Sequence, residues 1–244
     1  MLVNSCSALS ENSATKHNSG RVLKFVAHSK RVRDIAHDFG WLPGARYTNL
    51  RDIRGLSKVG FLDIHWKKYD FERHLSAAKT YRPLLTIARD IESLESLSHI
   101  LREADQLARV CPNVVLVPKD PRLAEIINSQ IPQRYILGYS VPTRYGGTLI
   151  PPEYFKRPTH LLGGRPDVQR ALASQMPVVS FDCNRFTLDA AFGDYFDGQI
   201  FRPHPVGGYE NCIRDSVRNI THLWSSYEPL GEAKRWLSRL THYN

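Results

Sequence analysis

Polar residues that could take part in chemistry follow the apolar runs of this sequence, at the point where each run ends. The set comprises three acids (Asp63, Asp90 and Asp182), Lys119 with Asp120, Tyr139, and the pair Gly163-Gly164. If the runs are parallel strands of a barrel, their carboxyl ends share one face, and active sites of barrel enzymes lie there. We therefore expect these residues to line one concave mouth. Asp120 is the exception, because an aspartate directly before Pro121 is typical of a helix N-cap.

A glycine turn offers a second candidate for ligand binding. Residues 157–172 read as a strand, a turn at Gly163-Gly164 and a helix opened by Pro166. Glycines let a backbone approach a ligand closely, and the free amides of a helix N-terminus favour an anion. With Arg165 and Arg170 beside the turn, a phosphate of nucleic acid could rest there. A plain tight turn between strand and helix is the simpler interpretation.

Other motifs with known chemistry are missing from the sequence. It contains no Walker pattern, no GxGxxG and no serine-hydrolase elbow. The residues His204, Cys212 and His222 form neither a CxxC nor an HExxH pair, which zinc sites commonly use. We therefore expect no cofactor and no bound metal.

The elements that must position these residues are eight short apolar runs. They span residues 22–28, 59–66, 83–90, 113–120, 135–142, 159–164, 178–184 and, weakest, 199–203. None alternates strictly between apolar and polar residues, which is typical of parallel strands covered on both faces. Helix-like stretches separate them at residues 70–79, 91–108, 121–127 and 166–173. The alternation predicts an α/β fold, a single (β/α)₈ TIM-type barrel, with an open doubly wound sheet as the rival.

Length and composition agree with one such domain. The chain has 244 residues, of which 42% are hydrophobic and 23% charged, so a sizeable core is available. The Ser- and Asn-rich residues 1–20 predict a disordered leader, and residues 21–244 form the predicted barrel domain. No linker or internal repeat suggests a further boundary.

The net charge of +9 favours an anionic partner, with nucleic acid first and an anionic membrane surface second. A basic but otherwise indifferent surface is the alternative. No run approaches the roughly 18 apolar residues that span a bilayer, and no secretory signal opens the chain. Four scattered cysteines (Cys6, Cys111, Cys183 and Cys212) do not describe a disulfide framework, so we expect reduced thiols and a cytoplasmic protein.

The segment from Thr159 to Phe201 resembles the tRNA-guanine transglycosylase superfamily. The resemblance is carried by two blocks, Leu161-Leu162-Gly163-Gly164-Arg165-Pro166 and Phe181-Asp182-Cys183, followed by Ala190, Ala191, Gly193 and Phe196. Upstream, Gly138-Tyr139-Ser140-Val141 lies where that family has a glycine-containing strand end lining the base pocket. The cysteine-rich zinc block of the family is missing. The chain therefore resembles the DNA-directed branch, represented by deoxypurine in DNA protein A.

The resemblance implies specific roles for three aspartates. Asp182 matches the family's nucleophile, which attacks the sugar C1′. Asp63 is the nearest counterpart of the general acid/base, although Ile64-His65-Trp66 stand where the family has Ser-Gly-Gly. Asp90 occupies the place of an aspartate that reads the purine edge. The implied activity is a glycosyltransferase reaction that inserts a 7-deazaguanine base, such as a preQ-type precursor, into DNA, with RNA possible.

The remaining predicted contacts are to substrate and to the nucleic-acid backbone. We expect the substrate to contact Lys119, Tyr139, Gly163 and Gly164. We expect the nucleic acid to contact six arginines, Arg46, Arg51, Arg54, Arg165, Arg170 and Arg185. Tyr47 and Trp66 complete a rim that could help an extruded nucleotide. Two alternatives stay open. One is an enzyme of the same fold that alters a deazaguanine already in DNA, and the other is a catalytically silent DNA-binding accessory barrel.

Overall fold

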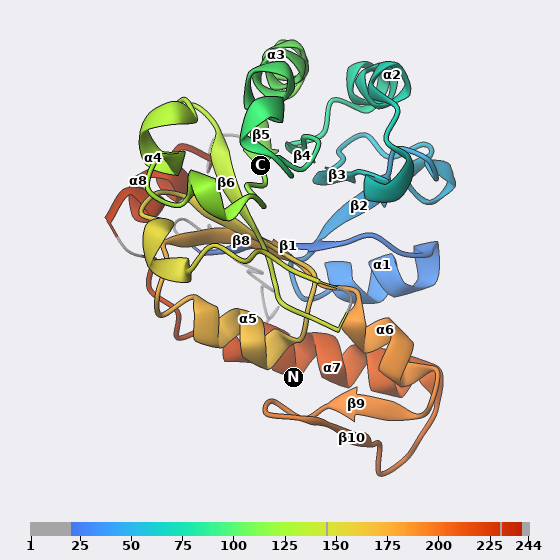
Figure 1. Ribbon diagram of the computed structural model, residues 1–244. Helices are drawn as coiled ribbons and strands as arrows, with labels where there is room; N and C mark the ends of the chain where they lie inside the picture. Colours follow the sequence, from blue (N-terminus) through green and yellow to red (C-terminus); the bar gives the residue numbers. More distant parts are fainter. Residues whose placement is uncertain (1–20, 145, 230, 241–244) are drawn as a thin grey trace, which may run out of the picture.

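Eight short strands pair in parallel, in chain order, and close on themselves. In the computed structural model, which describes residues 21–144, 146–229 and 231–240, β1 pairs with both β2 and β8 (Figure 1). The barrel strands are β1 (Leu23–Val26), β2 (Leu42–Arg46), β3 (Phe61–Asp63), β4 (Leu85–Ile87), β5 (Asn113–Leu116), β6 (Ile136–Ser140), β7 (Thr159–Leu162) and β8 (Val178–Asp182). The predicted TIM-type barrel is confirmed, and the closed sheet excludes the open doubly wound alternative.

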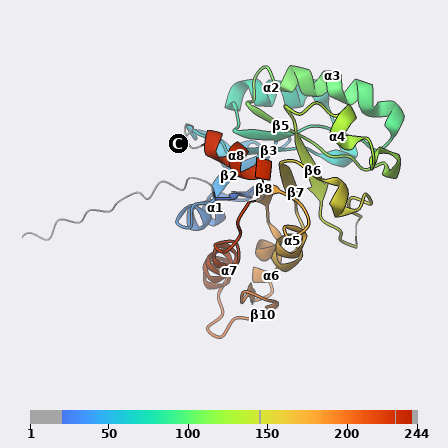
Figure 2. The same cartoon turned by 90° about the vertical axis from the view of Figure 1, so that its left-hand side faces the viewer.

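Helices cover the barrel unevenly. They are α1 (Lys30–His37), α2 (Phe71–Tyr81), α3 (Leu97–Leu107), α4 (Ile127–Gln130), α5 (Pro166–Leu172), α6 (Arg185–Ala190), α7 (Tyr209–Leu223) and α8 (Gly231–Leu240). Helices α2 and α3 lie on one side of the barrel, while α5, α6 and α7 lie on the other (Figures 1 and 2). In the described parts of the β2–β3 and β6–β7 connections, the regular structure is a 3₁₀ turn, η1 (Arg51–Ile53) and η5 (Pro152–Tyr154) respectively.

Three of the four predicted helices form close to their expected places. Asp70 caps α2 by accepting a hydrogen bond from the Arg73 backbone N–H at 3.0 Å. Helix α3 starts six residues later than expected, because the 3₁₀ turn η3 (Leu94–Ser96) precedes it, and α5 begins at Pro166 as its proline predicts. The stretch 121–127 is the exception. It forms the 3₁₀ turn η4 (Pro121–Leu123), and α4 follows only at Ile127.

One barrel strand was not predicted, and one predicted strand lies outside the barrel. The strand β2 has the sequence LPGAR, whose Pro43-Gly44 dipeptide is typical of a turn. Gly44 is required there because a Cβ atom would lie 2.9 Å from the Cβ of Phe61 on the neighbouring strand. Residues 199–203 instead contain β10 (Phe201–Pro203), which pairs antiparallel with β9 (Asp194–Phe196). The four residues between β9 and β10 are too few for a parallel crossover, and Asp197-Gly198 is a hairpin signal.

The outer core joins the barrel to α7 through stacked aromatic rings. The Phe181 ring lies parallel to that of Trp224 with 4.5 Å between centroids, and Trp41 meets Phe181 edge-on at 5.5 Å. The hairpin β9–β10 and α6 pack beside α7, beyond the barrel wall (Figure 2). This side of the barrel is therefore fixed by packing against α7.

Two sequence predictions fall partly outside the described residues. The leader at residues 1–20 lies outside them, as does Cys6. The other three cysteines, Cys111, Cys183 and Cys212, are buried and unpaired. Within the described part of the chain, no helix is both long and apolar enough to cross a membrane.

Candidate active site at the carboxyl end of the barrel

Three aromatic rings mark the inside of the barrel. Phe25 on β1, Phe61 on β3 and His160 on β7 come from strands that are not neighbours, yet their ring centroids lie 5.3 to 6.0 Å apart. Side chains from separated strands can meet only inside the barrel. The register of β1 and β8 also places the Asp182 side chain inside the barrel, because Asp182 pairs with Phe25 and points in the same direction. The Asp182 carboxylate thus lies inside the carboxyl end of the barrel.

Asp182 is held by its neighbours through a single oxygen. The Gly163 backbone N–H donates to Oδ1 at 3.1 Å, and His160 Nε2 lies 3.4 Å from the same atom. The Gln169 amide fixes the local backbone by donating to the carbonyls of both Gly163 and Asp182, at 2.7 and 2.8 Å. Among the described residues, these contacts all fall on Oδ1 or on the main chain. The second carboxylate oxygen, Oδ2, accepts no hydrogen bond from the described residues.

His160 is a functional candidate that the sequence did not reveal. Its side chain is fully buried, and its Nδ1 lies 2.8 Å from the Ser180 hydroxyl. An ionised Asp182 can only accept hydrogen bonds, so His160 Nε2 carries the ring proton toward it and the Ser180 hydroxyl donates to Nδ1. Apart from the long contact with Asp182, Nε2 has no partner in the described residues. His160 therefore orients Asp182 from beneath, at the cost of a poorly satisfied buried nitrogen.

Asp63 ends β3 at the same end of the barrel. Its carboxyl accepts a hydrogen bond from the Ile64 backbone N–H at 2.8 Å, and Arg46 Nε lies 3.6 Å from Oδ2. Burial, followed by the negative charge of Asp182, raises the pKa of Asp63 to about 7, despite smaller opposing effects of Ile64 and Arg46. The two acids therefore interact across the mouth. Near neutral pH, Asp63 holds a proton that it can give or take.

Asp90 and Lys119 form a second pair of acid and base, on the loops that follow β4 and β5. Lys119 Nζ lies 3.9 Å from Asp90 Oδ2, and both side chains are less than a fifth exposed. Burial raises the pKa of Asp90 to about 6 and lowers that of Lys119, although each charge favours the other. As expected from the sequence, Asp63, Asp90, Lys119 and Asp182 all lie at or beyond the carboxyl ends of barrel strands.

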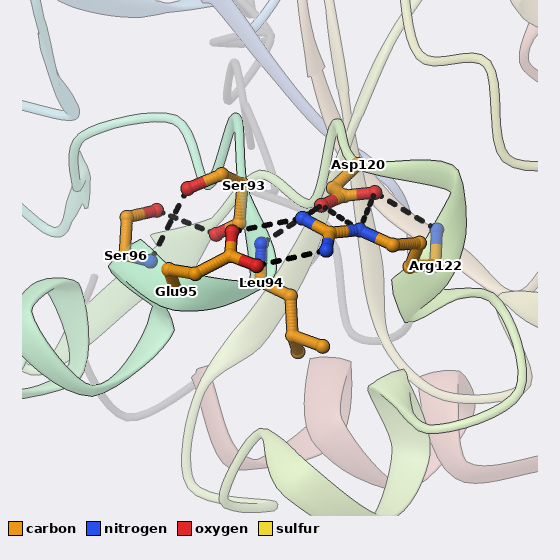
Figure 3. Close-up of polar contacts among 6 residues, drawn as sticks. All are labelled: Ser93, Leu94, Glu95, Ser96, Asp120 and Arg122. Atoms are coloured by element: carbon orange, nitrogen blue, oxygen red, sulfur yellow. Dashed lines mark hydrogen bonds and ion pairs between the residues drawn. The ribbon is translucent and has the colours of Figure 1, made fainter.

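Asp120 has the structural role expected of it. Its carboxylate accepts hydrogen bonds from the backbone N–H groups of Leu94 and Arg122, at 2.8 and 2.9 Å. The Arg122 guanidinium bridges Asp120 to Glu95 on the neighbouring loop, as Figure 3 shows. The contacts join the loops after β4 and β5, which carry Asp90 and Lys119. Asp120 thus supports the mouth without facing it.

Tyr139 does not line the mouth, and its assignment to the substrate is wrong. On β6, Gly138 pairs in register with the inward-facing His160, so the next residue, Tyr139, points outward. Its ring packs edge-on against Phe155 with centroids 5.0 Å apart, and the side chain is 3% exposed. The inward position belongs to Gly138, where a Cβ atom would lie 2.6 Å from Val117.

The glycine turn after β7 serves Asp182 rather than a phosphate. Gly163 and Gly164 both have positive φ, +58° and +86°, which glycine adopts without strain. A Cβ atom on Gly164 would meet Val141 Cγ1 at 2.4 Å, so this residue lets the β6 and β7 loops touch. The Gly163 N–H is already used by Asp182. The turn is therefore part of the carboxylate's support, in line with the simpler interpretation.

The six predicted arginine contacts divide into two groups. Arg46 lies beside Asp63, while Arg51 and Arg54 follow β2 and are exposed, with Arg51 paired to Asp52 at 3.4 Å. Of these three, Arg46 contacts a residue of the mouth. Arg165 pairs with Asp167 at 3.0 Å and Arg185 with Asp189 at 2.6 Å, and both guanidinium groups lie over the Phe201 ring.

The assignment of Arg170 to nucleic acid is wrong. Its guanidinium donates to the Leu223 carbonyl at 3.3 Å and lies over the rings of Trp224 and Tyr227. Arg170 thus packs against the end of α7. The predicted rim also loses Tyr47, which is fully buried, whereas Trp66 is 57% exposed.

Metal-ligating side chains do not gather at the mouth or elsewhere in the described residues. No group of three or more His, Cys, Asp or Glu side chains there could hold a metal ion. His204 has partners of its own, because Nε2 lies 3.0 Å from Asp215 and Nδ1 accepts from the Val206 and Gly207 backbone. The polar groups available at the mouth are carboxylates, cations and amides.

Fold and mouth together define a TIM-type barrel with a carboxylate pair at the carboxyl end of its strands. A family model described as "Family of unknown function (DUF6610)" matches residues 36–225, and the chain belongs to that family. Among solved structures, the YdjI aldolase from Escherichia coli K12 is similar, with a TM-score of 0.53, 13% identity and coverage of 86% of this chain and 94% of the aldolase. At that identity the similarity supports the barrel fold alone. A search of curated proteins gives no match.

Proposed function

We propose that this protein is an enzyme that exchanges a purine base of nucleic acid, most readily DNA, for a 7-deazaguanine base. The observation that carries the proposal is the unequal carboxylate pair: Asp63, whose pKa is raised to about 7, and Asp182, which is held by N–H donors at the same mouth. Two carboxyl groups in different surroundings, one of them with a raised pKa, suit a nucleophile and a general acid/base. The resemblance of residues 161–166 and 181–183 to transglycosylases supports the same roles.

The reaction follows from the carboxylate pair. Asp182 Oδ2 attacks the sugar C1′ as the bond to guanine breaks, and the departing base takes a proton from Asp63. The oxocarbenium-like sugar is thereby trapped as an ester of Asp182. The incoming deazaguanine gives a ring proton to the ionised Asp63, its nitrogen attacks C1′, and the ester bond to Asp182 breaks. No oxidant, reductant or nucleotide energy source is needed.

The remaining mouth residues fit the demands of this reaction. His160 and the Gly163 N–H hold Oδ1, so the attacking oxygen keeps a fixed direction. Arg46 lies beside Asp63 and balances the charge that this residue carries after giving up its proton. Asp90, with a pKa raised to about 6, can accept from ring N–H groups when ionised or donate when protonated. The target nucleotide must leave the helical stack to reach this depth.

The test is base insertion by the purified protein. Duplex and single-stranded DNA are incubated with a preQ-type base, digested to nucleosides and measured by mass spectrometry. The proposal predicts a deazaguanine nucleoside and an equal release of guanine. Conversion only of DNA that already contains a deazaguanine would contradict exchange and indicate a modifying enzyme. Binding without any change in nucleosides would instead indicate an accessory barrel.

A further inference from the structure

Two adjoining pockets lie beside the carboxylate pair, around the loop between β3 and α2. Their volumes are about 280 and 430 Å³, and they share Lys68 and Tyr69 as a common wall. The first also contains Asp90 and Ile64, the residue that follows Asp63, so it lies next to the carboxyl ends of β3 and β4. The second extends to Arg73 on α2. The two pockets together are here called the β3–α2 groove.

Among the described residues, the cations that line the groove form no direct ion pair. Lys67, Lys68 and Arg89 line the first pocket, and Lys68 and Arg73 line the second. Across the described part of the chain, many other arginines form ion pairs, but none of these four side chains pairs with an acid. The lining also contains three acids: Asp90 faces Lys119, Asp70 caps α2, and Glu92 lines the first pocket. With four cations and three acids, the lining has an excess of positive charge, which suits phosphate groups.

An exposed aromatic ring accompanies this charge. The Trp66 side chain is 57% exposed, and the Lys67 ammonium lies 5.0 Å from its ring centroid. The Trp66 ring is therefore open to a stacking partner from solvent. An aromatic face beside cations is the combination used to bind single-stranded nucleic acid, in which a base stacks and the backbone follows the charge.

The loop that carries these residues is held rigid by a buried network. The Tyr47 hydroxyl donates to the Lys68 carbonyl at 3.0 Å and accepts from the Asp70 N–H at 2.8 Å, which clamps the backbone of the turn. Such clamping reduces the conformational entropy that would be lost on binding.

A second chain of hydrogen bonds fixes the Tyr69 ring. The Thr86 hydroxyl donates to the Leu62 carbonyl at 2.9 Å, so it accepts from His74 Nε2 at 2.8 Å. His74 Nδ1, 3.1 Å from the Tyr69 hydroxyl, must then accept the phenol proton. Burial lowers the pKa of His74 to about 4, which keeps the ring neutral and preserves this direction. The wall shared by the two pockets is thus preorganised.

We infer that the β3–α2 groove binds the single-stranded segment flanking the reacting nucleotide, with a base against Trp66 and phosphates at Lys68 and Arg73. The inference rests on the proposed function for the identity of the partner. An exposed aromatic ring beside cations suits the stacking of an unpaired base, which favours a single strand. In this inference the groove takes over the nucleic-acid contacts that the sequence predicted for Arg165, Arg170 and Arg185. These three lie on the other side of the barrel and contact other parts of the chain.

The inference is tested by anisotropy of a fluorescent 12-nucleotide single strand across a salt series. The double variant Lys68→Gln/Arg73→Gln should weaken binding about 10- to 100-fold and flatten the log–log salt slope by about 1.4, since each phosphate contact of a single strand contributes about 0.7. Trp66→Leu should weaken binding about tenfold and leave the slope unchanged, because stacking is not ionic. The matched control is Lys79→Gln/Arg109→Gln, which removes the same charge at the opposite end of the barrel.

The contradicting outcomes show whether the groove inference or the proposed function fails. Control and groove variants that lose affinity equally would overturn the groove, even if the wild type binds and exchanges bases. A polyglutamate peptide that displaces the oligonucleotide at equal charge concentration would also overturn it in favour of an acidic protein partner. A wild-type protein that binds no single strand at any salt concentration would contradict the nucleic-acid partner of the proposed function itself. Circular dichroism melts of every variant exclude unfolding as the cause.

Discussion

At the scale of single residues, the candidate site depends on how two carboxylates differ. Asp182 lies beside two donors, the Gly163 N–H and His160. The pKa of Asp63 is raised by burial and by the negative charge of Asp182. The same strand-end position therefore gives the two carboxyl groups different surroundings. His160 contributes through Asp182 and has no route of its own to a substrate, because it is fully buried.

The raised pKa of Asp63 makes stability depend on pH. Its pKa is about 7 in the folded protein and 3.8 in an ordinary setting, so its contribution to stability is complete below about pH 4 and is lost as pH rises through 7. Asp63→Asn removes this loss. The free energy of unfolding of the variant minus that of wild type should therefore be about 2 kcal/mol larger at pH 8 than at pH 5. Urea denaturation at both pH values measures the change.

The control for this prediction is Asp38→Asn, an exposed carboxylate that pairs with Arg214 on the surface. It should leave the pH dependence of wild type in place. If Asp63→Asn behaves like this control, Asp63 is not held in its neutral form, and its role as proton carrier loses its physical basis.

At the scale of elements, the loops after the strands position the site more than the strands themselves do. The turn between β7 and α5 supplies the N–H that holds Asp182, and Gly164 lets it pack against Val141 in the β6–β7 connection. The Asp120–Arg122–Glu95 cluster joins the loops after β4 and β5 in a similar way (Figure 3). These contacts fix the mouth from two sides.

A pair of glycine substitutions tests the turn. Gly164→Ala places a methyl group 2.4 Å from Val141 Cγ1 at a φ of +86°, and it should lower the free energy of unfolding by about 2–4 kcal/mol. Gly163→Ala meets nothing within 4 Å, so only its φ of +58° opposes the substitution, and the expected cost is about 1 kcal/mol. Thermal melts compare the two, and equal losses would contradict the described contact between the loops.

At the scale of the whole molecule, the closed barrel and the general location of the site could be predicted from the sequence. Apolar runs without alternation identified seven of the barrel strands, and the acids following them lie at the mouth. The strand β2 could not be recognised, because Pro43 and Gly44 are typical of a turn and only the crowding by Phe61 explains the glycine. Nor could inward and outward residues be separated in strands covered on both faces, which is why Tyr139 was misplaced.

His160 was missed for a related reason. It lies in the middle of the run THLL, where a histidine resembles a core residue, and the sequence contains no sign of the Asp182 carboxylate above it. The signal that could have identified it is a polar residue two positions before the last residue of a barrel strand, because side chains two positions apart on a strand point to the same face. The charge of +9 predicts basic contacts to an anionic partner, but the partner acids near Arg165 and Arg185 become visible only in the folded chain.

The most direct test of the central claim is labelled-base exchange by Asp182→Asn, with thermal melting and DNA binding measured on the same preparation. The substitution keeps the side chain's shape and removes the charge that traps the sugar. Exchange should fall by at least about a thousandfold, because no covalent intermediate forms. DNA affinity should remain within about twofold of wild type, since phosphate contacts are made by cations elsewhere. Full exchange by a folded Asp182→Asn protein would contradict the assignment of Asp182 as nucleophile.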